Sequence, residues 1–139
     1  MTWCAESCTL NARDRMRIAG SSLGAHQTWL DSLAANIANV NTIRSTAGPA
    51  YQATTPIVGS RTDGGVAVIG IAQGDPEGRL EYAPDNPLAD ANGYVRAPDI
   101  DLASQMTQLI MAQRGFQASV QVTKNAQDNY NAALQIGRA

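Results

Sequence analysis

The fold is decided by residues 102–134, LASQMTQLIMAQRGFQASVQVTKNAQDNYNAAL. One set of positions returns there at alternating intervals of three and four, which is the period of one face of an α-helix. The stripe comprises Leu102, Met106, Leu109, Gln113, Phe116, Val120, Thr123, Gln127, Tyr130 and Leu134. Asp99 or Asp101 can cap the helix start, and Gly137 can end the helix. The pattern therefore predicts a C-terminal helix over residues 98–138, roughly 50 Å long at 1.5 Å per residue.

A second stripe with the same period lies near the N-terminus. Its members are Met16, Ala19, Leu23, His26, Leu30, Leu33, Ile37 and Val40. It predicts a helix over residues 16–41, whereas residues 1–15 show no periodicity and are expected to form a disordered leader. We expect the first and last helices to pair as a coiled coil, because pairing buries both stripes. Between Ile18 and Val40 the only fully charged side chain is Asp31, which is typical of a helix covered on more than one side.

The residues between the two helices, 42–97, have the pattern of short β-strands and turns. The segment Tyr51–Val58 and the β-branched run Val66–Ile71 are typical of strands, and Asp63–Gly65 between them is a turn signal. A third short strand is predicted at Arg79–Tyr82. The sequence therefore predicts a mainly α-helical fold with a small β insert, in which a short β-hairpin region lies between two long helices.

The composition argues against several classes of function. Charged residues make up 16% of the 139 residues, the net charge is -2, and the ten Lys and Arg do not cluster. Nothing therefore indicates a nucleic-acid-binding or anionic-membrane surface. No run approaches the roughly 18 apolar residues of a membrane span, and no cleaved secretory signal is predicted. We expect a protein that stays in the cytosol or is exported without a cleaved signal.

No cluster of residues predicts catalysis, a cofactor or a metal. Cys4, Cys8 and His26 are too few ligands for a zinc site, and no phosphate loop or dinucleotide fingerprint occurs. The acidic turn around Asn92–Gly93 faintly resembles a calcium loop, but Leu88 stands where the first acidic ligand belongs. We interpret that segment as a solvated turn. His26 lies on the apolar stripe without a catalytic serine–histidine–acid spacing and is expected to pack there, so the chain is predicted not to be an enzyme.

Several motifs in the chain resemble those of bacterial flagellar rod and hook proteins. The first is LAANIANVNT at residues 33–42, followed by a Gly-Pro-x-Tyr form at residues 48–51 that is similar to proximal-rod members. The second half carries DANGYV at 90–95, PDIDL at 98–102 and AQRGFQA at 112–118. The family usually has Ala-Tyr where this chain has Gly115-Phe116. The resemblance covers roughly residues 17–138 and implies a single rod-protein domain over residues 16–139.

The resemblance implies a structural subunit of the proximal rod in the flagellar basal body, part of the periplasm-crossing drive shaft for motility. In such a rod, subunits pack helically and their terminal helices form the inner coiled-coil wall. The implied partners are other rod subunits, copies of the chain itself, the basal-body base and the flagellar type III export apparatus, which needs no cleaved signal. The predicted assembly interface comprises Leu23, Leu30, Leu33, Ile37, Val40, Leu102, Met106, Leu109, Phe116, Val120, Tyr130 and Leu134.

Three alternatives remain open at this stage. A hook or distal-rod relative shares the terminal motifs but has a larger middle region. A free-standing helical adaptor or export chaperone would fold as a soluble oligomer without rod partners. A wall-cutting hydrolase would need a convergent pair of acids or a metal cluster in a cleft, whereas the acids of this chain lie in predicted turns and helix caps.

Overall fold

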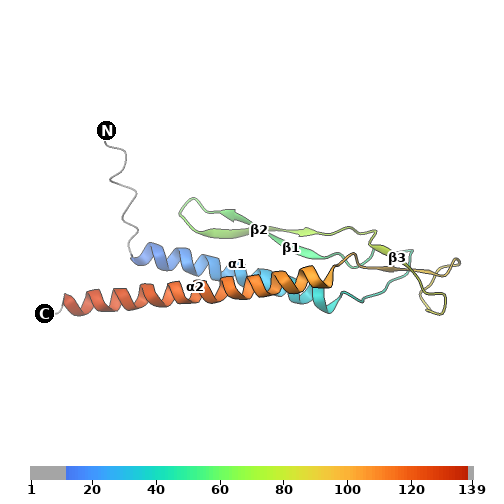
Figure 1. The fold of residues 1–139 in the computed structure, drawn as a ribbon. Helices are drawn as coiled ribbons and strands as arrows, with labels where there is room; N and C mark the ends of the chain where they lie inside the picture. Colours follow the sequence, from blue (N-terminus) through green and yellow to red (C-terminus); the bar gives the residue numbers. More distant parts are fainter. Residues whose placement is uncertain (1–11, 138–139) are drawn as a thin grey trace, which may run out of the picture.

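Two long helices, with a β-hairpin laid along one of them, form the body of the molecule (Figure 1). The structure is a computed structural model that describes residues 12–137. The elements follow in the order α1 Ala12–Ala38, β1 Thr54–Ser60, β2 Val66–Gln73, β3 Arg79–Tyr82, β4 Tyr94–Ala97 and α2 Leu102–Ile136. The predicted layout of helix, β insert and helix is confirmed.

Helix α1 begins and ends earlier than the sequence pattern predicts. It starts at Ala12 instead of Met16, so residues 12–15 of the expected disordered leader are helical. Asp14 lies in the first turn, where a carboxylate interacts favourably with the positive end of the helix dipole. Residues 1–11 of the expected leader lie outside the described residues.

The C-terminal end of α1 is set by Asn39 instead of Asn41. The Asn39 side-chain amide donates to the Ala35 carbonyl at 2.8 Å, and its carbonyl oxygen accepts from the Thr42 hydroxyl at 3.1 Å. The Asn39 N–H still donates to the Ala35 carbonyl, but the next backbone bonds, from Val40 to Ile37 and from Thr42 to Asn39, span only three residues, so the helix gives way to a turn after Ala38.

Helix α2 is capped by two of the residues that the sequence indicates. The Asp101 carboxylate accepts from the backbone N–H groups of Ala103 and Ser104, at 3.3 and 3.0 Å. The helix therefore starts at Leu102, and the expected start at residue 98 is wrong because residues 98–101 lead into the cap. Gly137 caps the other end, where its N–H donates to the Ala133 carbonyl at 3.2 Å. Residue 138 of the expected helix lies outside the described part of the chain.

The β insert consists of two separate two-stranded antiparallel sheets. Strands β1 and β2 pair from Thr54↔Gln73 to Ser60↔Val66, with an irregularity after Ile57. The turn between them uses Gly64 and Gly65 at φ 85° and 93°, a conformation that favours glycine. The first strand therefore runs from Thr54 to Ser60 and not from Tyr51 to Val58 as predicted.

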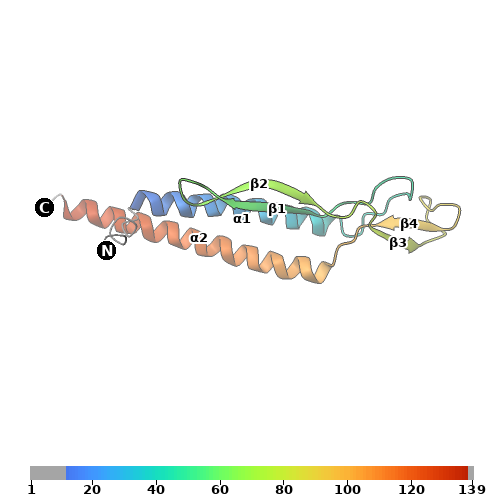
Figure 2. The ribbon, with the colours of Figure 1, turned by 90° about the horizontal axis from the view of Figure 1, so that it is seen from above.

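The second sheet contains a strand that the sequence analysis does not predict. Strand β3 occupies the expected residues Arg79–Tyr82, and its partner β4 follows the Asn92-Gly93 turn. Their register runs from Arg79↔Ala97 to Tyr82↔Tyr94. This strand pair lies beyond the end of the helices, far from the start of α1 and the end of α2 (Figure 2).

The buried core contains few large side chains. Among the described residues, the buried apolar side chains are Ala19, Leu33, Ala50, Val95, Ala97, Ala112 and Ala126. Most of these are alanines, whereas many larger apolar residues on α2 and on the hairpin are exposed. Exposed apolar surface of this extent is a mark of interaction surfaces. Among the described helices, neither is long and apolar enough to cross a membrane.

Candidate assembly interface

Helices α1 and α2 lie side by side in opposite directions, and two hydrogen bonds join them. The Ser22 hydroxyl donates to the Ser119 hydroxyl at 2.9 Å, and the Asn36 amide donates to the Gln105 side-chain oxygen at 3.1 Å. Residue numbers rise along α1 as they fall along α2, so the pairing is antiparallel, as Figures 1 and 2 also show. The start of α1 and the end of α2 therefore lie at the same end of the molecule.

Small residues of α2 form the surface that faces α1. Ala112 and Ala126 are buried, and a Cβ atom added at Gly115 would overlap the His26 ring. His26 is held in that position because its Nδ1–H donates to the Ser22 carbonyl at 2.7 Å, which leaves Nε2 directed at Gly115. Side chains this small allow two helices to approach closely.

The face of α2 that meets α1 is therefore not centred on the predicted stripe. Gln105, Gly115 and Ser119 each lie one residue before a stripe position, and one residue is a rotation of about 100° around an α-helix. The two stripes therefore meet only in part: Leu109, Phe116 and Thr123 of the α2 stripe are partly buried beside the small residues, while its other large members are exposed. Met106 and Val120 lie to the side of the contact and are about half exposed.

The predicted interface residues consequently differ in exposure between the helices. On α2, five of them are between 43% and 51% exposed, namely Leu102, Met106, Val120, Tyr130 and Leu134, while Leu109 and Phe116 are partly buried. On α1, Leu33 is buried and Leu23, Leu30, Ile37 and Val40 are partly buried. Helix α1 contacts both α2 and the β1–β2 hairpin, so much of its stripe is already covered within the subunit.

Asn36 connects three elements and is a site residue that sequence reasoning missed. Its side chain is 1% exposed, accepts from the Thr54 N–H at 2.8 Å and donates to the Thr54 carbonyl at 2.9 Å. It also donates to Gln105 and accepts from the Tyr51 hydroxyl. Its position beside Leu33 on the helix is the signal that could have found it, because an asparagine on a buried face needs partners.

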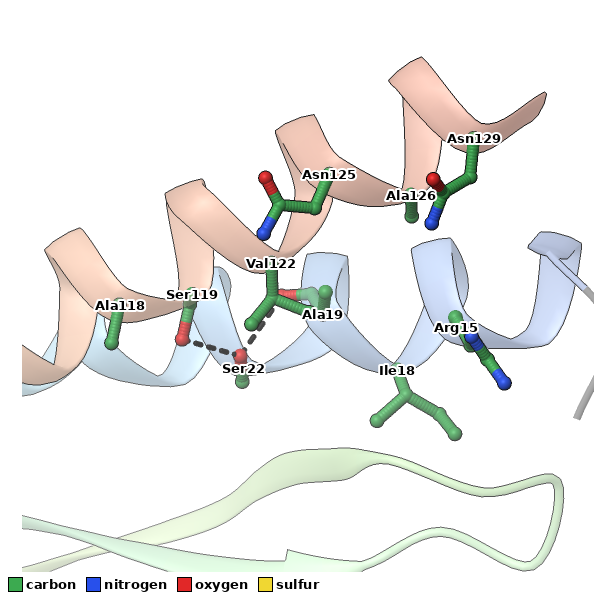
Figure 3. Close-up of a pocket in the computed structure, with 10 residues that line it drawn as sticks. All are labelled: Arg15, Ile18, Ala19, Ser22, Ala118, Ser119, Val122, Asn125, Ala126 and Asn129. Atoms are coloured by element: carbon green, nitrogen blue, oxygen red, sulfur yellow. Dashed lines mark hydrogen bonds between the residues drawn. The ribbon is translucent and has the colours of Figure 1, made fainter. Parts of the chain in front are cut away.

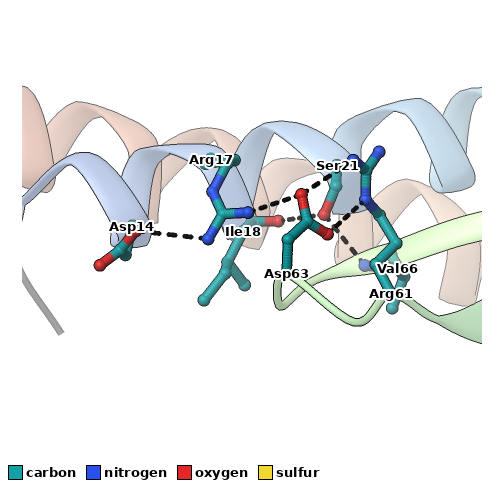
Figure 4. Close-up of polar contacts among 7 residues, drawn as sticks. All are labelled: Asp14, Arg17, Ile18, Ser21, Arg61, Asp63 and Val66. Carbon is teal, nitrogen blue, oxygen red and sulfur yellow. Dashed lines mark hydrogen bonds and ion pairs between the residues drawn. The ribbon is translucent and has the colours of Figure 1, made fainter.

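The turn of the β1–β2 hairpin is fastened to α1 by charge and by hydrogen bonds (Figure 4). Arg17 pairs with Asp63 at 2.7 Å, and Asp63 also accepts two hydrogen bonds from Arg61 at 2.9 Å. The hydrogen bonds from Arg61, helped by the charges of Arg61 and Arg17, lower the pKa of Asp63 from 3.8 to about 2. Beside this cluster, the Ser21 hydroxyl accepts from the Val66 N–H at 3.1 Å.

The acidic segment near Asn92 closes a turn. The Asp90 carboxylate accepts from the N–H groups of Asn92 and Tyr94, at 2.9 and 3.0 Å. The hydrogen bond from the Tyr94 amide is the largest of the causes that hold the Asp90 pKa below its ordinary value. The described residues contain no group of three metal-ligating side chains, and this carboxylate is engaged by the backbone of its own turn.

Two grooves lie along α1. One, of about 480 Å³, runs between α1 and α2 and includes Ile18, Val122 and Asn125 (Figure 3). The other, of about 370 Å³, lies between α1 and the hairpin and includes Trp29 and Pro56. No aspartate or glutamate lines either groove. Their shape and apolar lining suit packing against another protein.

Comparison with known proteins identifies the class to which this architecture belongs. Residues 91–136 match the family described as "Flagellar basal body rod FlgEFG protein C-terminal". This match covers the end of the insert, including β4, and the whole of α2, which is the C-terminal third of the chain. Together with the paired terminal helices, it places the chain among the axial proteins of the bacterial flagellum.

Matches to whole proteins define the family more closely. The chain is 32% identical over 126 residues to the flagellar basal-body rod protein FlgC of Salmonella typhimurium, covering 87% of this chain and 94% of that protein. Identity is 36% over 127 residues to FlgC of Yersinia enterocolitica, with the same coverage. It is 26% over 150 residues to FlgC of Bacillus subtilis, covering 93% of this chain and all of that protein. The chain belongs to the FlgC family of flagellar basal-body rod proteins, a structural family and not a known enzyme family.

Proposed function

We propose that this chain is a structural subunit of the proximal rod that builds the rod wall through the large apolar side chains of α2. The observation that carries this proposal is the half-exposure of Leu102, Met106, Val120, Tyr130 and Leu134 after α2 has paired with α1. Met106 and Val120 lie beside the intramolecular contact, and Leu102, Tyr130 and Leu134 lie toward the two ends of α2, where a neighbouring helix can reach them. Burying them in an assembly contributes roughly 25 cal/mol per Å² of apolar surface.

The scarcity of charge on α2 supports a location inside a wall. Between Leu102 and Ile136 the only charged residues are Arg114, Lys124 and Asp128. A helix with one free side ordinarily carries more charge there, whereas a helix with neighbours on several sides would have to desolvate that charge at a cost of several kcal/mol per ion. The antiparallel helix pair thus fits the inner coiled-coil wall that rod proteins are expected to form.

The partners of the subunit follow from this location. They are copies of itself, other rod subunits and the basal-body base. The chain reaches the periplasm through the flagellar type III export apparatus, without a cleaved signal. The high coverage of complete FlgC proteins supports this assignment, because the chain spans 94% of the Salmonella protein that is named for the rod.

Aspartate substitutions on α2 test the proposal. Val120→Asp places a carboxylate at a position that is solvated in the single subunit, so the free energy of unfolding should change by only about 0.5 kcal/mol. In the assembled wall the same carboxylate would be buried without a partner, which is strongly unfavourable. We expect cells that carry Val120→Asp or Leu109→Asp to make the protein but to lose swimming and complete rods. Leu109 is partly buried, so Val120 is the cleaner site.

The matched control is Thr62→Asp in the exposed turn of the hairpin. It introduces the same charge away from α2 and should leave swimming intact. Motility in soft agar and electron microscopy of purified basal bodies give the two readouts. Normal swimming with Val120→Asp, or an equal defect with Thr62→Asp, would show that the free face of α2 is not the assembly surface.

A further inference from the structure

The sheet formed by β3 and β4 has one face that the helices leave uncovered. Among the described helices and strands, β3 and β4 contact only each other, and they lie beyond the end of the helices (Figure 2). Tyr94 and Arg96 point to one side of β4, because the residues that alternate with them are buried on the other side. Their partners on β3 are Tyr82 and Leu80. Directly opposite residues of an antiparallel pair point to the same side, so all four side chains share one face.

Arg44 extends this face onto a third segment of the chain. Its backbone exchanges two hydrogen bonds with Arg96, each at 2.9 Å, in an antiparallel bridge. The two residues are directly opposite, so their side chains lie on the same side with Cβ atoms about 4.5–5.5 Å apart. Two arginines therefore occupy neighbouring positions on one surface. We call Arg44, Leu80, Tyr82, Tyr94 and Arg96 the arginine–tyrosine face.

The positive charge of the two arginines has no carboxylate partner among the described residues. The ion pairs that these residues form all lie near the start of α1. The neighbouring acid, Asp90, accepts from backbone N–H groups of its own turn, and no arginine is among the groups that lower its pKa. The Arg96 side chain donates to the Thr46 carbonyl at 3.4 Å, whereas its Nε is buried without an acceptor. A buried donor without an acceptor is unfavourable, so a bound acceptor would satisfy a group that this subunit leaves unsatisfied.

The tyrosines and Leu80 give the face large exposed side chains. Tyr82 is 65% exposed, Leu80 is 59% exposed and Tyr94 is 41% exposed. The two tyrosine rings pack edge to face with their centroids 5.4 Å apart, so each ring helps to hold the other in place. Tyrosine and arginine are among the residue types that contribute most binding energy at protein interfaces. The composition of the face therefore favours a polypeptide that has both apolar and negatively charged groups.

We propose that the arginine–tyrosine face binds an acidic segment of a different basal-body protein, in which carboxylates stand beside apolar side chains. The carboxylates lie over Arg44 and Arg96, where a rotated Arg96 guanidinium can donate from Nε and a terminal nitrogen to one carboxylate. The apolar side chains lie over Leu80 and the tyrosines. A second copy of the chain joined through the same face would oppose the arginines of both copies, which is electrostatically unfavourable.

This inference rests on the proposed function as a rod subunit, but it concerns the insert and not α2. A photo-crosslinking phenylalanine analogue at position 82 tests it in purified basal bodies, and the exposure of Tyr82 should leave the substituted subunit folded. Mass spectrometry of the product should find a different polypeptide, attached at a segment that contains aspartate or glutamate. The yield is counted as cross-linked product per basal body, from cells that also carry the native chain.

Arg44→Glu, combined with the analogue, should lower this yield by about tenfold or more, because like charges then face each other across the contact. Arg44 is exposed, so circular dichroism of the variant should match that of the native chain. Arg79→Glu is the matched control, because Arg79 is an exposed arginine on the other face of the same sheet. It should leave the yield unchanged. Replacing the carboxylate residue of the cross-linked segment by arginine should restore the yield in the Arg44→Glu background.

The outcomes separate this inference from the proposed function. No product, or a product with another copy of this chain only, from basal bodies that contain the chain would overturn the assigned partner while the rod function stands. An unchanged yield with Arg44→Glu, an equal loss with Arg79→Glu or a failure of the charge exchange to restore the product would overturn the role of the arginines. Absence of the unsubstituted chain from basal bodies would overturn the proposed function as well.

Discussion

Asn36 shows how a single polar side chain can organise a fold whose core is mostly alanine. Its amide binds both backbone groups of Thr54, the first residue of β1, and also reaches Gln105 on α2. In a low-dielectric interior such hydrogen bonds are strong, and an unmade one is costly. Asn36 therefore fixes where the hairpin begins and where α2 lies relative to α1.

We predict that Asn36→Ala destabilises the subunit by about 1–3 kcal/mol. The substitution leaves the Thr54 N–H without its partner, and an unsatisfied buried group costs that amount. Urea unfolding followed by circular dichroism measures the change. Asn131→Ala, on the exposed side of α2, is the control and should alter the free energy of unfolding by no more than about 0.5 kcal/mol. Equal effects of the two substitutions would contradict the role of Asn36.

His26 and Gly115 form a second close contact between the helices. The imidazole ring of His26 occupies the space that a side chain at position 115 would take. Gly115→Ala should gain about 1 kcal/mol of helix propensity but lose about 1–3 kcal/mol through overpacking against His26. We therefore expect Gly115→Ala to lower the melting temperature in the native background. In the His26→Ala background the ring is gone, and the same substitution should raise the melting temperature.

Thermal unfolding of the four proteins in this double-mutant cycle measures the coupling between the two sites. The single substitutions and the double substitution must be compared with the native chain under one set of conditions. If Gly115→Ala has the same effect with and without His26, the ring does not set the distance between the helices.

At the scale of elements, the long helices are predictable and the short strands are not. A 3.6-residue period repeated over the 35 residues of α2 is visible above the variation of single positions. Strand β4 has 4 residues, and only the alternation of Val95 and Ala97 toward the interior marks it. That signal is too short to separate from the turn at Asn92-Gly93 before the partner strand is known.

The face of α2 that contacts α1 escaped sequence analysis for a different reason. A search for periodicity gives weight to leucine, methionine, phenylalanine and valine, whereas this contact is made by Ala112, Gly115, Ser119 and Ala126. Small residues carry little hydrophobic signal, but they allow the closest helix approach. The stripe of large residues thus indicated which face of α2 is apolar. The face that packs against α1 was set instead by the small side chains that allow close approach. The bonds of Asn36 to Thr54 and Gln105 were likewise invisible, because they join distant parts of the sequence.

The stability of the folded chain should depend on pH through Asp63 in the turn of the hairpin. Its pKa is lowered from 3.8 to about 2 in the folded chain, chiefly by the hydrogen bonds from Arg61. A group whose folded pKa is depressed contributes stability above its unfolded pKa, and this contribution is lost as the pH falls through the folded value. We therefore expect a loss of stability specific to Asp63 between about pH 4 and pH 2.

Comparison with Asp63→Asn isolates this contribution. The stability of the native chain and of the variant should converge as the pH is lowered toward 2, the folded pKa of Asp63. Asp90 also has a lowered pKa, but its contribution is present in both proteins and cancels from the difference. Parallel pH profiles of the two proteins would show that the Asp63 carboxylate makes no pH-dependent contribution to stability.

At the scale of the whole molecule, two N-terminal deletions that differ by four residues test the role of the first turn of α1. Deleting residues 2–11 leaves all of α1 in place, whereas deleting residues 2–15 removes Ala12–Arg15. Arg15 lines the groove between the helices, so we expect the longer deletion to reduce swimming and the shorter one to preserve it. Motility assays with immunoblots of cytoplasmic protein provide the measurement. Loss of swimming after the shorter deletion, at normal protein levels, would show that residues 2–11 are themselves required.

The helix pair is joined by hydrogen bonds at two places along its length, Ser22 to Ser119 and Asn36 to Gln105. On α1 these places are 14 residues apart, or roughly 21 Å at 1.5 Å per residue. Two helices joined at one point can rotate about that point, whereas two helices joined at two separated points cannot change their crossing angle without breaking a hydrogen bond. A twist applied to one end of the subunit is therefore resisted by both hydrogen bonds, and the two helices turn together. In a rod built from such subunits, we expect each helix pair to move as one rigid unit.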